Sequence, residues 1–462
     1  MQTFDGLTPA PGSFRDPSGF VFLSDSIVYR TINDVFKKDW EQMIASGFAQ
    51  SAMEKELLVP FEECTPMFGS WKTIRSPRLN VISYPYEWCF SQLKDAALLT
   101  LSLLEESLQH GLALKDATAF NVQFQGASPI FIDHLSFEVR KPDKPWAAYL
   151  QFCRHFLAPL ALLHYRGGEM GRLSSLWVEG LPLSVTSSLL PFRSRFSLSM
   201  KIHLHMHAQL QDKHSDAREH ADAVKKLNVK PGALEKLCQS LRYAVEDLRL
   251  PEQKTEWGDY YSDTNYSEAA AKNKAEIVET IARENTGTQA IDLGANTGEY
   301  SRLLAQYFEH VVAADVDFMA VERHYLRLAK ERKSNITPMV LDMCNPSPGL
   351  GFANEERASF PDRFQANMVT ALALIHHLTL GSGIPLTRVA YCFSRLLQQG
   401  GTLVLEFVPL EDSQAQRLMA ARTNVFDDYS LEGCLAAFGK FFALKNKFAI
   451  VDSYRTILVF KK

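Results

Sequence analysis

The chain has 462 residues, of which 46% are hydrophobic, and this length predicts two or three domains with large apolar cores. Its formal net charge of −4 disfavours a nucleic-acid partner, because phosphate contacts require clustered Lys and Arg side chains. The seven cysteines include no Cys-x-x-Cys pair, the apolar runs are too short to span a bilayer, and the first twenty residues lack a signal-peptide core. We therefore expect reduced thiols, no membrane span and a cytoplasmic protein.

The first 250 residues are expected to form an α+β domain. Alternating apolar residues over Ser18–Ile32 predict a β-hairpin. The aromatic segment Tyr84–Trp88 precedes an amphipathic helix predicted from about Gln92 to His110. Its aromatic side chains could form a hydrophobic core or a recognition site, and a core is the more common role.

Two aspartates and an asparagine are spaced along Gly111–Glu138. Asp116 is followed five residues later by Asn121, and two short β-like runs joined by a turn at Gly126 end at Asp133. This pattern resembles the catalytic segment of protein kinases and aminoglycoside-phosphotransferase-like enzymes, in which an Asp-x-x-x-x-Asn loop precedes a hairpin that ends in a metal-binding Asp. The resemblance implies that Asp116 would orient or deprotonate an acceptor hydroxyl, while Asn121 and Asp133 would hold Mg²⁺ on the phosphates of ATP.

Several positions depart from the kinase pattern. Leu-Lys replaces the His-Arg pair before the catalytic aspartate, and His-Leu follows Asp133 in place of Phe-Gly. The hairpin over Ser18–Ile32 has neither a glycine-rich phosphate loop nor a clear nucleotide-binding lysine, and Arg30 is the nearest basic residue. A degenerate kinase-like domain that recognises a substrate or a partner is therefore expected, and a helix–hairpin–helix scaffold with two accidental acids is the alternative.

Three histidines, His203, His205 and His207, alternate in the sequence H-L-H-M-H. A strand would place all three on one face, as a metal site requires, whereas a helix would scatter them. No acid or cysteine completes an obvious ligand set, so no metal site is expected.

A polar segment punctuated by Pro and Gly, Leu248–Asp259, predicts a domain boundary, which divides the chain into residues 1–250 and 251–462. A helix is predicted over Ser267–Glu284. Four aromatic residues at this entrance could cover a cofactor or pack a domain seam: Trp257, Tyr260, Tyr261 and Tyr266.

The segment Ala290–Ser301, A-I-D-L-G-A-N-T-G-E-Y-S, predicts a strand, a tight turn and the start of a helix. Glycine suits the turn because it tolerates positive φ and lets a ligand approach the backbone. The dinucleotide pattern G-x-G-x-x-G is disfavoured, because Asn296 and Glu299 stand where its second and third glycines would be. The segment resembles the first β-loop-α unit of class I S-adenosylmethionine (SAM)-dependent methyltransferases.

Later segments extend this resemblance. A buried-strand pattern over Val311–Asp317 ends in acids, and the resemblance places Asp315, or alternatively Asp317, at the ribose diol. A third strand ends at Asp342, which would contact the adenine amino group while Met343 flanks the ring.

The resemblance implies an α/β domain with a Rossmann-like seven-stranded sheet. Further strands are predicted over Asn367–Leu378 and Thr402–Val408, with a closing antiparallel hairpin around Phe448–Val451 and Thr456–Phe460. The residues implied to bind SAM are Asp292, Gly294, Ala295, Asn296, Gly298, Asp315, Val316, Asp342 and Met343.

Methyl transfer from SAM mainly requires alignment of the acceptor, and a protic acceptor also benefits from a general base. The catalytic candidates are His376 and His377, at the end of the fourth predicted strand, and Glu406, which follows the apolar run of the fifth. Both histidines could instead only shape the cofactor pocket. The acceptor, a small molecule or a macromolecule, is not identified by the sequence. The alternative function is a bifunctional or regulatory protein whose first domain binds Mg-ATP or docks a partner.

Overall fold

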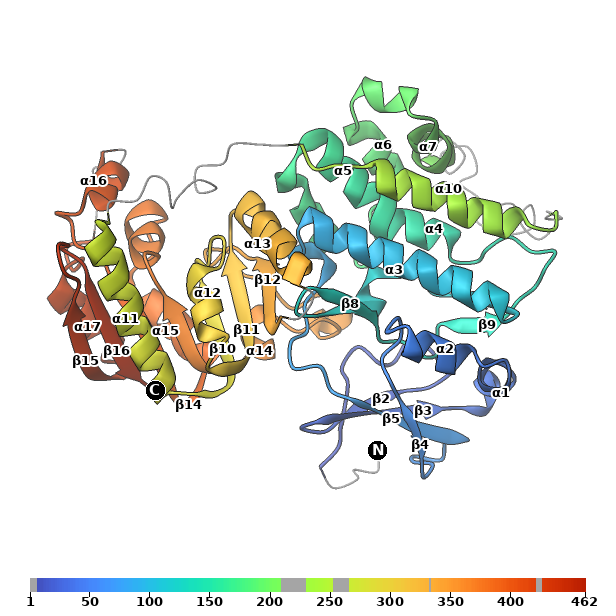
Figure 1. The fold of residues 1–462 in the computed structure, drawn as a ribbon, viewed down its shortest axis with the longest axis horizontal. Coiled ribbons are helices and arrows are strands. Elements are labelled where there is room, and N and C mark those ends of the chain that lie inside the picture. The colour runs from blue at the N-terminus through green and yellow to red at the C-terminus, as the bar shows by residue number, and fades with distance from the viewer. Residues whose placement is uncertain (1–5, 209–229, 252–265, 332–333, 421–425) are drawn as a thin grey trace. The chain divides into compact units, whose positions relative to one another are not determined.

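The computed structural model describes residues 6–208, 230–251, 266–331, 334–420 and 426–462 (Figure 1). The chain forms two compact units: Met1–Gln253 with Leu350–Arg357, and Lys254–Gly349 with Ala358–Lys462. The sequence predicted one boundary near residue 250, so it did not predict that Leu350–Arg357 belongs to the first unit. Of the four aromatic residues predicted at the entrance, Trp257, Tyr260 and Tyr261 lie outside the described residues.

The first unit begins with a five-stranded antiparallel sheet of order β1-β2-β3-β5-β4. Its strands are β1 (Thr8–Pro9), β2 (Val21–Leu23), β3 (Ile27–Ile32), β4 (Glu62–Cys64) and β5 (Lys72–Pro77), and helices α1 (Lys37–Ala45) and α2 (Phe48–Glu54) fall between β3 and β4. The predicted hairpin over Ser18–Ile32 is confirmed, because β2 pairs antiparallel with β3.

The long helix α3 (Phe90–Gln109) confirms the predicted amphipathic helix. Two small two-stranded sheets follow it. Strand β6 (Leu112–Leu114) pairs with β9 (Phe137–Val139), and β7 (Val122–Gln125) pairs with β8 (Ser128–Phe131). The β7–β8 turn uses Gly126 at a φ of 63°, as predicted. The aromatic side chains of residues 84–88 are buried, which is the expected core role.

The remaining helices of the first unit are α4 (Tyr149–Phe152), α5 (Ala158–Arg166), α6 (Leu183–Leu189), α7 (Leu198–Met200) and α10 (Ala233–Asp247). Helix α7 continues as a wider π-helical turn, η7 (Lys201–Met206), so the three alternating histidines lie on a helix and not on a strand. Among the described residues, no group of three or more His, Cys, Asp or Glu side chains could hold a metal ion.

The returning segment Leu350–Arg357 makes specific contacts within the first unit. The carboxylate of Glu356 accepts a hydrogen bond from Arg15 Nη2 at 2.6 Å, and the guanidinium of Arg357 lies 4.3 Å from the ring centroid of Phe120. A buried carboxylate paired with an arginine, together with a cation–π contact, gives this segment a defined place in the unit.

The second unit is built on a seven-stranded mixed sheet of order β12-β11-β10-β13-β14-β16-β15. The strands are β10 (Gly287–Leu293), β11 (Phe308–Asp315), β12 (Ile336–Val340), β13 (Ala366–Ala371), β14 (Leu397–Phe407), β15 (Ala443–Ala449) and β16 (Thr456–Lys461). Strands β10 to β14 run parallel, while β16 is antiparallel to both β14 and β15. This confirms the predicted α/β sheet with a closing antiparallel hairpin.

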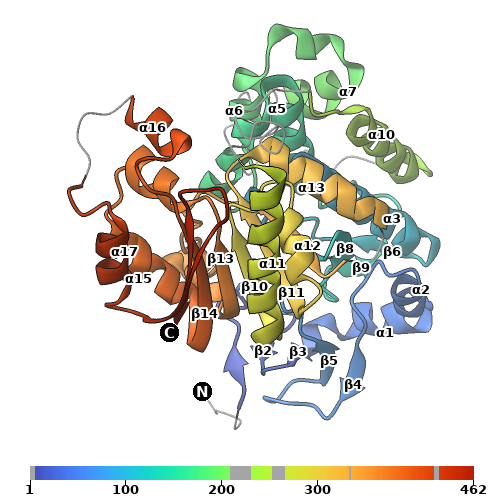
Figure 2. The ribbon, with the colours of Figure 1, turned by 60° about the vertical axis from the view of Figure 1, so that its left-hand side comes forward.

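Helices cover this sheet, as its buried strands require (Figure 2). Helices α12 (Glu299–Leu304) and α13 (Phe318–Glu331) pack against β10 to β12, and α15 (Leu386–Leu396) packs against β13 and β14. The others are α11 (Glu268–Glu284), α14 (Phe360–Arg363), α16 (Ser413–Met419) and α17 (Leu431–Phe438). Of the helices in the described ranges, none combines the length and the hydropathy that a membrane span requires.

Candidate cofactor site

The turn between β10 and α12 adopts positive φ values, the left-handed conformation that favours glycine. Gly294, Asn296 and Gly298 adopt φ values of 74°, 50° and 85°. The backbone N–H of Gly294 donates to the carbonyl of Ala314 on β11 at 2.9 Å, which ties the turn to the neighbouring strand. A Cβ on Gly298 would lie 2.1 Å from the ring of His324, whereas a Cβ on Gly294 would meet nothing closer than 3.6 Å.

A cavity of about 350 Å³ lies at the carboxyl ends of β10 to β13, where ligands bind in open α/β sheets. It is lined by the turn after β10 and by the segments that follow β11, β12 and β13. The lining residues are Gly294, Asn296, Asp315, Val316, Leu341, Asp342, Met343, Cys344, Leu372, Ala373, Leu374, His377, Leu378 and Ser382. Seven of the residues proposed from the sequence therefore lie around one cavity.

Asp315 is the acid that the end of β11 brings to the cavity. Its Oδ2 accepts the backbone N–H of Asn296 at 2.7 Å and its Oδ1 accepts that of Asp317 at 2.8 Å. Burial raises the pKa of the Asp315 carboxyl to about 6, despite these two hydrogen bonds. Each carboxylate oxygen can accept more than one hydrogen bond, so Asp315 retains acceptor capacity for hydroxyl groups of a ligand.

Asp317, the alternative ribose ligand, serves a different purpose. Its Oδ1 accepts the backbone N–H groups of Met319 and Ala320 at 2.8 and 3.1 Å, which caps the start of α13. Asp317 is absent from the cavity lining, whereas Asp315 is part of it. The geometry thus favours Asp315 for ligand contact.

Asp342 follows β12 on the same side of the sheet. Its Oδ1 accepts the backbone N–H of Cys344 at 2.9 Å, which shapes the segment around Met343. Val316, Leu341 and Met343 add apolar surface to this part of the cavity. A carboxylate beside apolar walls suits a planar heterocycle that carries an amino group.

Three of the predicted cofactor residues, Asp292, Ala295 and Gly298, do not line the cavity. The buried Asp292 accepts hydrogen bonds from the hydroxyl of Ser301 on α12 at 2.7 Å and from that of Thr370 on β13 at 2.8 Å. Burial raises the pKa of the Asp292 carboxyl, and the two hydroxyl donors oppose that shift. Asp292 therefore joins three elements behind the cavity.

The two neighbouring histidines differ in position. β13 ends at Ala371, so both lie beyond the strand where the sequence pattern placed them, at the start of a helical turn. His377 lines the cavity, whereas His376 is buried with 1% of its surface exposed. Burial, with Arg455 nearby, lowers the pKa of His377 to about 4, and burial lowers that of His376 well below its ordinary value. Both imidazoles are therefore neutral at pH 7.

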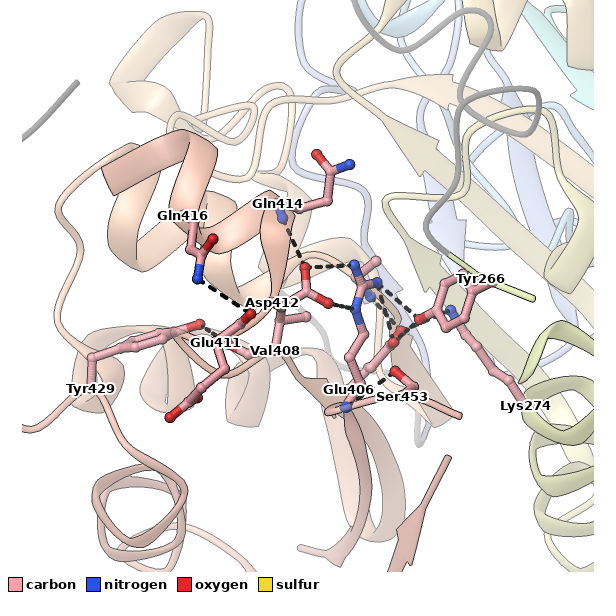
Figure 3. A network of polar contacts seen from close by, with 12 residues as sticks. Tyr266, Lys274, Glu406, Val408, Glu411, Asp412, Gln414, Gln416, Tyr429 and Ser453 are labelled. Atoms are coloured by element: carbon pink, nitrogen blue, oxygen red, sulfur yellow. Dashed lines mark hydrogen bonds and ion pairs between the residues drawn. The ribbon is translucent and has the colours of Figure 1, made fainter. Parts of the chain in front are cut away.

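Glu406, the third catalytic candidate, is not among the residues that line the cavity. It belongs instead to a network of polar side chains (Figure 3). Its carboxylate is fully buried, 2.7 Å from Lys274 Nζ and 3.5 Å from Arg455 Nη1, and it accepts a hydrogen bond from the Tyr266 hydroxyl. Burial alone would raise the pKa of Glu406, but the two cations outweigh it and the pKa lies below its ordinary value. The carboxylate of Glu406 is therefore ionised, and its partners are Lys274, Arg455 and Tyr266.

Arg455 extends this network through a two-pronged ion pair with Asp412, with Nε–Oδ2 and Nη2–Oδ1 distances of 2.7 and 3.1 Å (Figure 3). Sequence reasoning missed Lys274 and Arg455. A usable sign was present in α11, where Ala270, Lys274 and Val278 recur every four residues on its buried face. A lysine on an apolar stripe requires a buried anionic partner.

In the first unit, Asp116, Asn121 and Asp133 have protein partners. Asp133 forms an ion pair with Arg30, and Asn121 Nδ2 donates to the Ser136 hydroxyl at 3.1 Å. Asp116 Oδ1 accepts from the side-chain amide of Gln151 at 2.7 Å, and its pKa is raised by burial and then by the charge of Asp133. An arginine thus sits where the kinase resemblance would put a metal ion, so these residues do not fit Mg²⁺-ATP.

Comparison with known proteins shows a relative that matches along nearly the whole chain. No family model matches the chain. Nodulation protein NoeA from Rhizobium meliloti (strain 1021) is 32% identical over 465 residues, which cover 98% of this chain and 95% of NoeA. The chain belongs to the NoeA family. The similarity therefore runs through both units of this chain.

Solved methyltransferase structures match the C-terminal part of this NoeA-family chain. N-methyltransferase NodS from Bradyrhizobium japonicum WM9 is 12% identical, and the match covers 42% of this chain and 98% of NodS with a TM-score of 0.32. Magnesium protoporphyrin IX methyltransferase (ChlM) from Synechocystis PCC 6803 with bound SAH is 16% identical, with 44% and 90% covered and a TM-score of 0.31. The parallel strands β10 to β14, closed by antiparallel β16, give the second unit a class I SAM-dependent methyltransferase fold.

Proposed function

We propose that the protein is a SAM-dependent methyltransferase whose second unit binds SAM in the cavity at the ends of β10 to β13. The observation that carries this proposal is the convergence of Asp315, Asp342 and the turn at Gly294 on one cavity. Asp315 would accept hydrogen bonds from the ribose hydroxyls, and Asp342 would accept one from the adenine amino group. Val316 and Met343 would flank the ring.

SAM supplies an activated methyl group on a sulfonium, so the chain has to bind, orient and exclude water. His377 lines the cavity and is neutral, so its ring can accept a hydrogen bond from a protic acceptor. A pKa of about 4 makes His377 a weak general base, and we propose that it mainly orients the acceptor. We assign His376 and Glu406 to support of the cavity wall, since neither is part of its lining.

For the first unit we propose a degenerate kinase-like domain that recognises the acceptor or docks a partner. The order of its elements supports this proposal: an antiparallel sheet, a long helix, and a hairpin that is followed by Asp133. Because Arg30 pairs with Asp133, this proposal includes no phosphate transfer.

Thermal unfolding of the full chain with SAM, S-adenosylhomocysteine, NAD and Mg-ATP tests the proposed activity class. SAM and S-adenosylhomocysteine should each raise the melting temperature, because a ligand that binds the folded state stabilises it by mass action. NAD and Mg-ATP should leave it unchanged. A rise with NAD and none with SAM would replace the methyltransferase proposal with a dinucleotide-binding one.

A further inference from the structure

The first unit exposes large apolar side chains along one short stretch, residues 189–206. Phe192, Phe196 and Leu198 are 72%, 79% and 71% exposed, and the two phenyl rings contact edge to face at 5.5 Å. Isolated exposed apolar residues are ordinary, but a contiguous group marks an interaction surface. We call the exposed side chains of residues 189–206 the aromatic–basic face.

The helix that carries part of this face is apolar on its outer side as well as on its inner side, where Met200 and Leu204 are buried. Ile202 and Met206 follow Leu198 at intervals of four residues along α7 and η7, and both are exposed, at 39% and 48%. The polar side chains of His203 and His205 are instead buried, at 1% and 4% exposure. A surface helix normally presents polar side chains on its outer side, so an outward apolar row beyond the buried one is typical of an interaction surface.

Buried hydrogen bonds hold the aromatic turn in place. The Ser194 hydroxyl donates to the carbonyl of Pro191 at 2.7 Å, so it accepts from His205 Nε2 at 2.8 Å. His205 Nδ1 then accepts from the Ser187 hydroxyl at 2.7 Å. With Ser194 fixed inward, its neighbours Arg193 and Arg195 and both phenylalanines are exposed. The aromatic side chains are thus presented by a packed structure.

The charge of this stretch has one sign. Residues 181–208 contain Arg193, Arg195 and Lys201 and no Asp or Glu. Among the described residues, no carboxylate forms an ion pair with any of the three. The guanidinium of Arg193 lies 5.5 Å from the ring centroid of Tyr165, which limits where it can point. Exposed cations beside exposed aromatic side chains complement a surface that is both anionic and apolar.

We propose that the aromatic–basic face docks on an anionic lipid membrane. Phe192, Phe196 and Leu198 would enter the boundary between headgroups and acyl chains, while the arginines and Lys201 contact anionic headgroups. We favour a membrane over a protein partner because apolar and basic side chains are interleaved along one short stretch, and an anionic membrane offers negative charge and apolar chains side by side over its whole surface. Helices α6 and α7 lie at the end of the first unit away from its five-stranded sheet (Figure 1).

Flotation of the full chain with lipid vesicles tests this docking. The protein should float with equimolar phosphatidylcholine and phosphatidylglycerol, should not float with phosphatidylcholine alone, and should dissociate at high salt. The triple variant R193Q/R195Q/K201Q should lose roughly a hundredfold in vesicle partitioning, on the basis of about fivefold for each basic side chain. The double variant F192S/F196S should also fail to float, and Val35→Ser, at a 68% exposed apolar site, should float like the wild type.

All of these side chains are exposed, so circular dichroism and the melting temperature should stay unchanged and separate lost docking from lost folding. Absence of flotation with the anionic vesicles would overturn the proposal, as would F192S/F196S floating as well as Val35→Ser. If light scattering shows a dimer that F192S/F196S converts to a monomer, and vesicles bind nothing, a second copy of the chain is the occupant instead of the membrane.

Discussion

The carboxylate of Glu406 accepts a hydrogen bond from the backbone N–H of Ala373 at 2.8 Å. Ala373 lines the cavity with a φ of 49°, a conformation that residues other than glycine seldom adopt. Lys274 and Arg455 keep this carboxylate ionised, so it is a strong acceptor for that N–H. Glu406 therefore fixes one wall of the cavity from behind.

Glu406→Ala should destabilise the protein by about 3–5 kcal/mol, because it leaves two buried cations with only one remaining carboxylate partner, Asp412. Urea unfolding of the full chain measures this loss. Glu411→Ala removes an exposed acid from the turn that follows β14 and should change stability by less than about 0.5 kcal/mol. If the two variants were equally stable, the structural role assigned to Glu406 would be contradicted.

The affinity for SAM should depend on pH through Asp315. Its raised pKa of about 6 means that the carboxyl of the empty cavity takes up a proton below that pH, and a protonated carboxyl is a weaker acceptor for two hydroxyl groups. Affinity should therefore be constant above pH 7 and fall by up to about tenfold per pH unit below 6. Calorimetric titration between pH 5 and 8 measures it, and Asp315→Asn should bind weakly without this dependence. An unchanged pH profile in Asp315→Asn would assign the titration to another group.

Two glycines of the turn should respond differently to the same substitution. Gly298→Ala should destabilise the protein by about 1–3 kcal/mol, since the new Cβ would lie 2.1 Å from the His324 ring and φ is 85°. Gly294→Ala shares the strain of a positive φ, 74°, but its Cβ would make only ordinary contacts with Leu374 from 3.6 Å. It should therefore destabilise the protein less than Gly298→Ala and should also weaken SAM binding, because the methyl group enters the cavity lining. Denaturant midpoints and SAM affinities of the pair separate the two effects. The account is contradicted if Gly294→Ala is the less stable of the two.

The sequence predicted the sheet of the second unit because each strand is a short apolar run followed by an acid or a turn. The sequence also predicted that Asp315, Asp342 and Gly294 lie close together, because the carboxyl ends of parallel strands meet at one edge of a sheet, and all three line the cavity. It could not separate residues that line the cavity from those one layer behind. Asp292 and Glu406 both lie one residue before the end of a strand. The carboxylate of Asp292 nevertheless accepts a hydrogen bond from the buried hydroxyl of Ser301, and that of Glu406 pairs with the buried cation of Lys274.

Other features depended on contacts between distant segments. The pairing of Arg30 with Asp133 joins residues 103 apart, so the spacing of Asp116, Asn121 and Asp133 gave no sign that protein groups occupy them. The place of Leu350–Arg357 in the first unit likewise depends on Arg15, far away in the sequence. Local patterns carry no information on either contact.

The adjacent histidines offer a matched test of cavity lining against burial. His376→Ala should destabilise the protein by about 1–3 kcal/mol, since that ring is 1% exposed in the core. His377→Ala should retain stability and alter SAM affinity or turnover, because this ring lines the cavity. Urea unfolding measures the stability of both variants, and SAM titration measures their affinity. If His377→Ala lost stability and His376→Ala lost SAM affinity, the roles assigned to the two histidines would be wrong.

The full chain should show no micromolar affinity for Mg-ATP, because Arg30 pairs with the aspartate that would hold the metal. Calorimetric titration of Mg-ATP at neutral pH measures this. Micromolar binding that is lost in Asp133→Ala would show a functional nucleotide site and revive a bifunctional enzyme.

The central claim is that the cavity bounded by Asp315 and Asp342 is a SAM site. Equilibrium dialysis of labelled SAM against the full chain at neutral pH tests it most directly, with Asp315→Ala as the variant and Glu411→Ala as the matched control. We predict saturable binding of one SAM per chain, weakened by roughly 1–3 kcal/mol in Asp315→Ala and unchanged in Glu411→Ala. Absence of saturable binding at high micromolar SAM, or equal binding by all three proteins, would contradict the account.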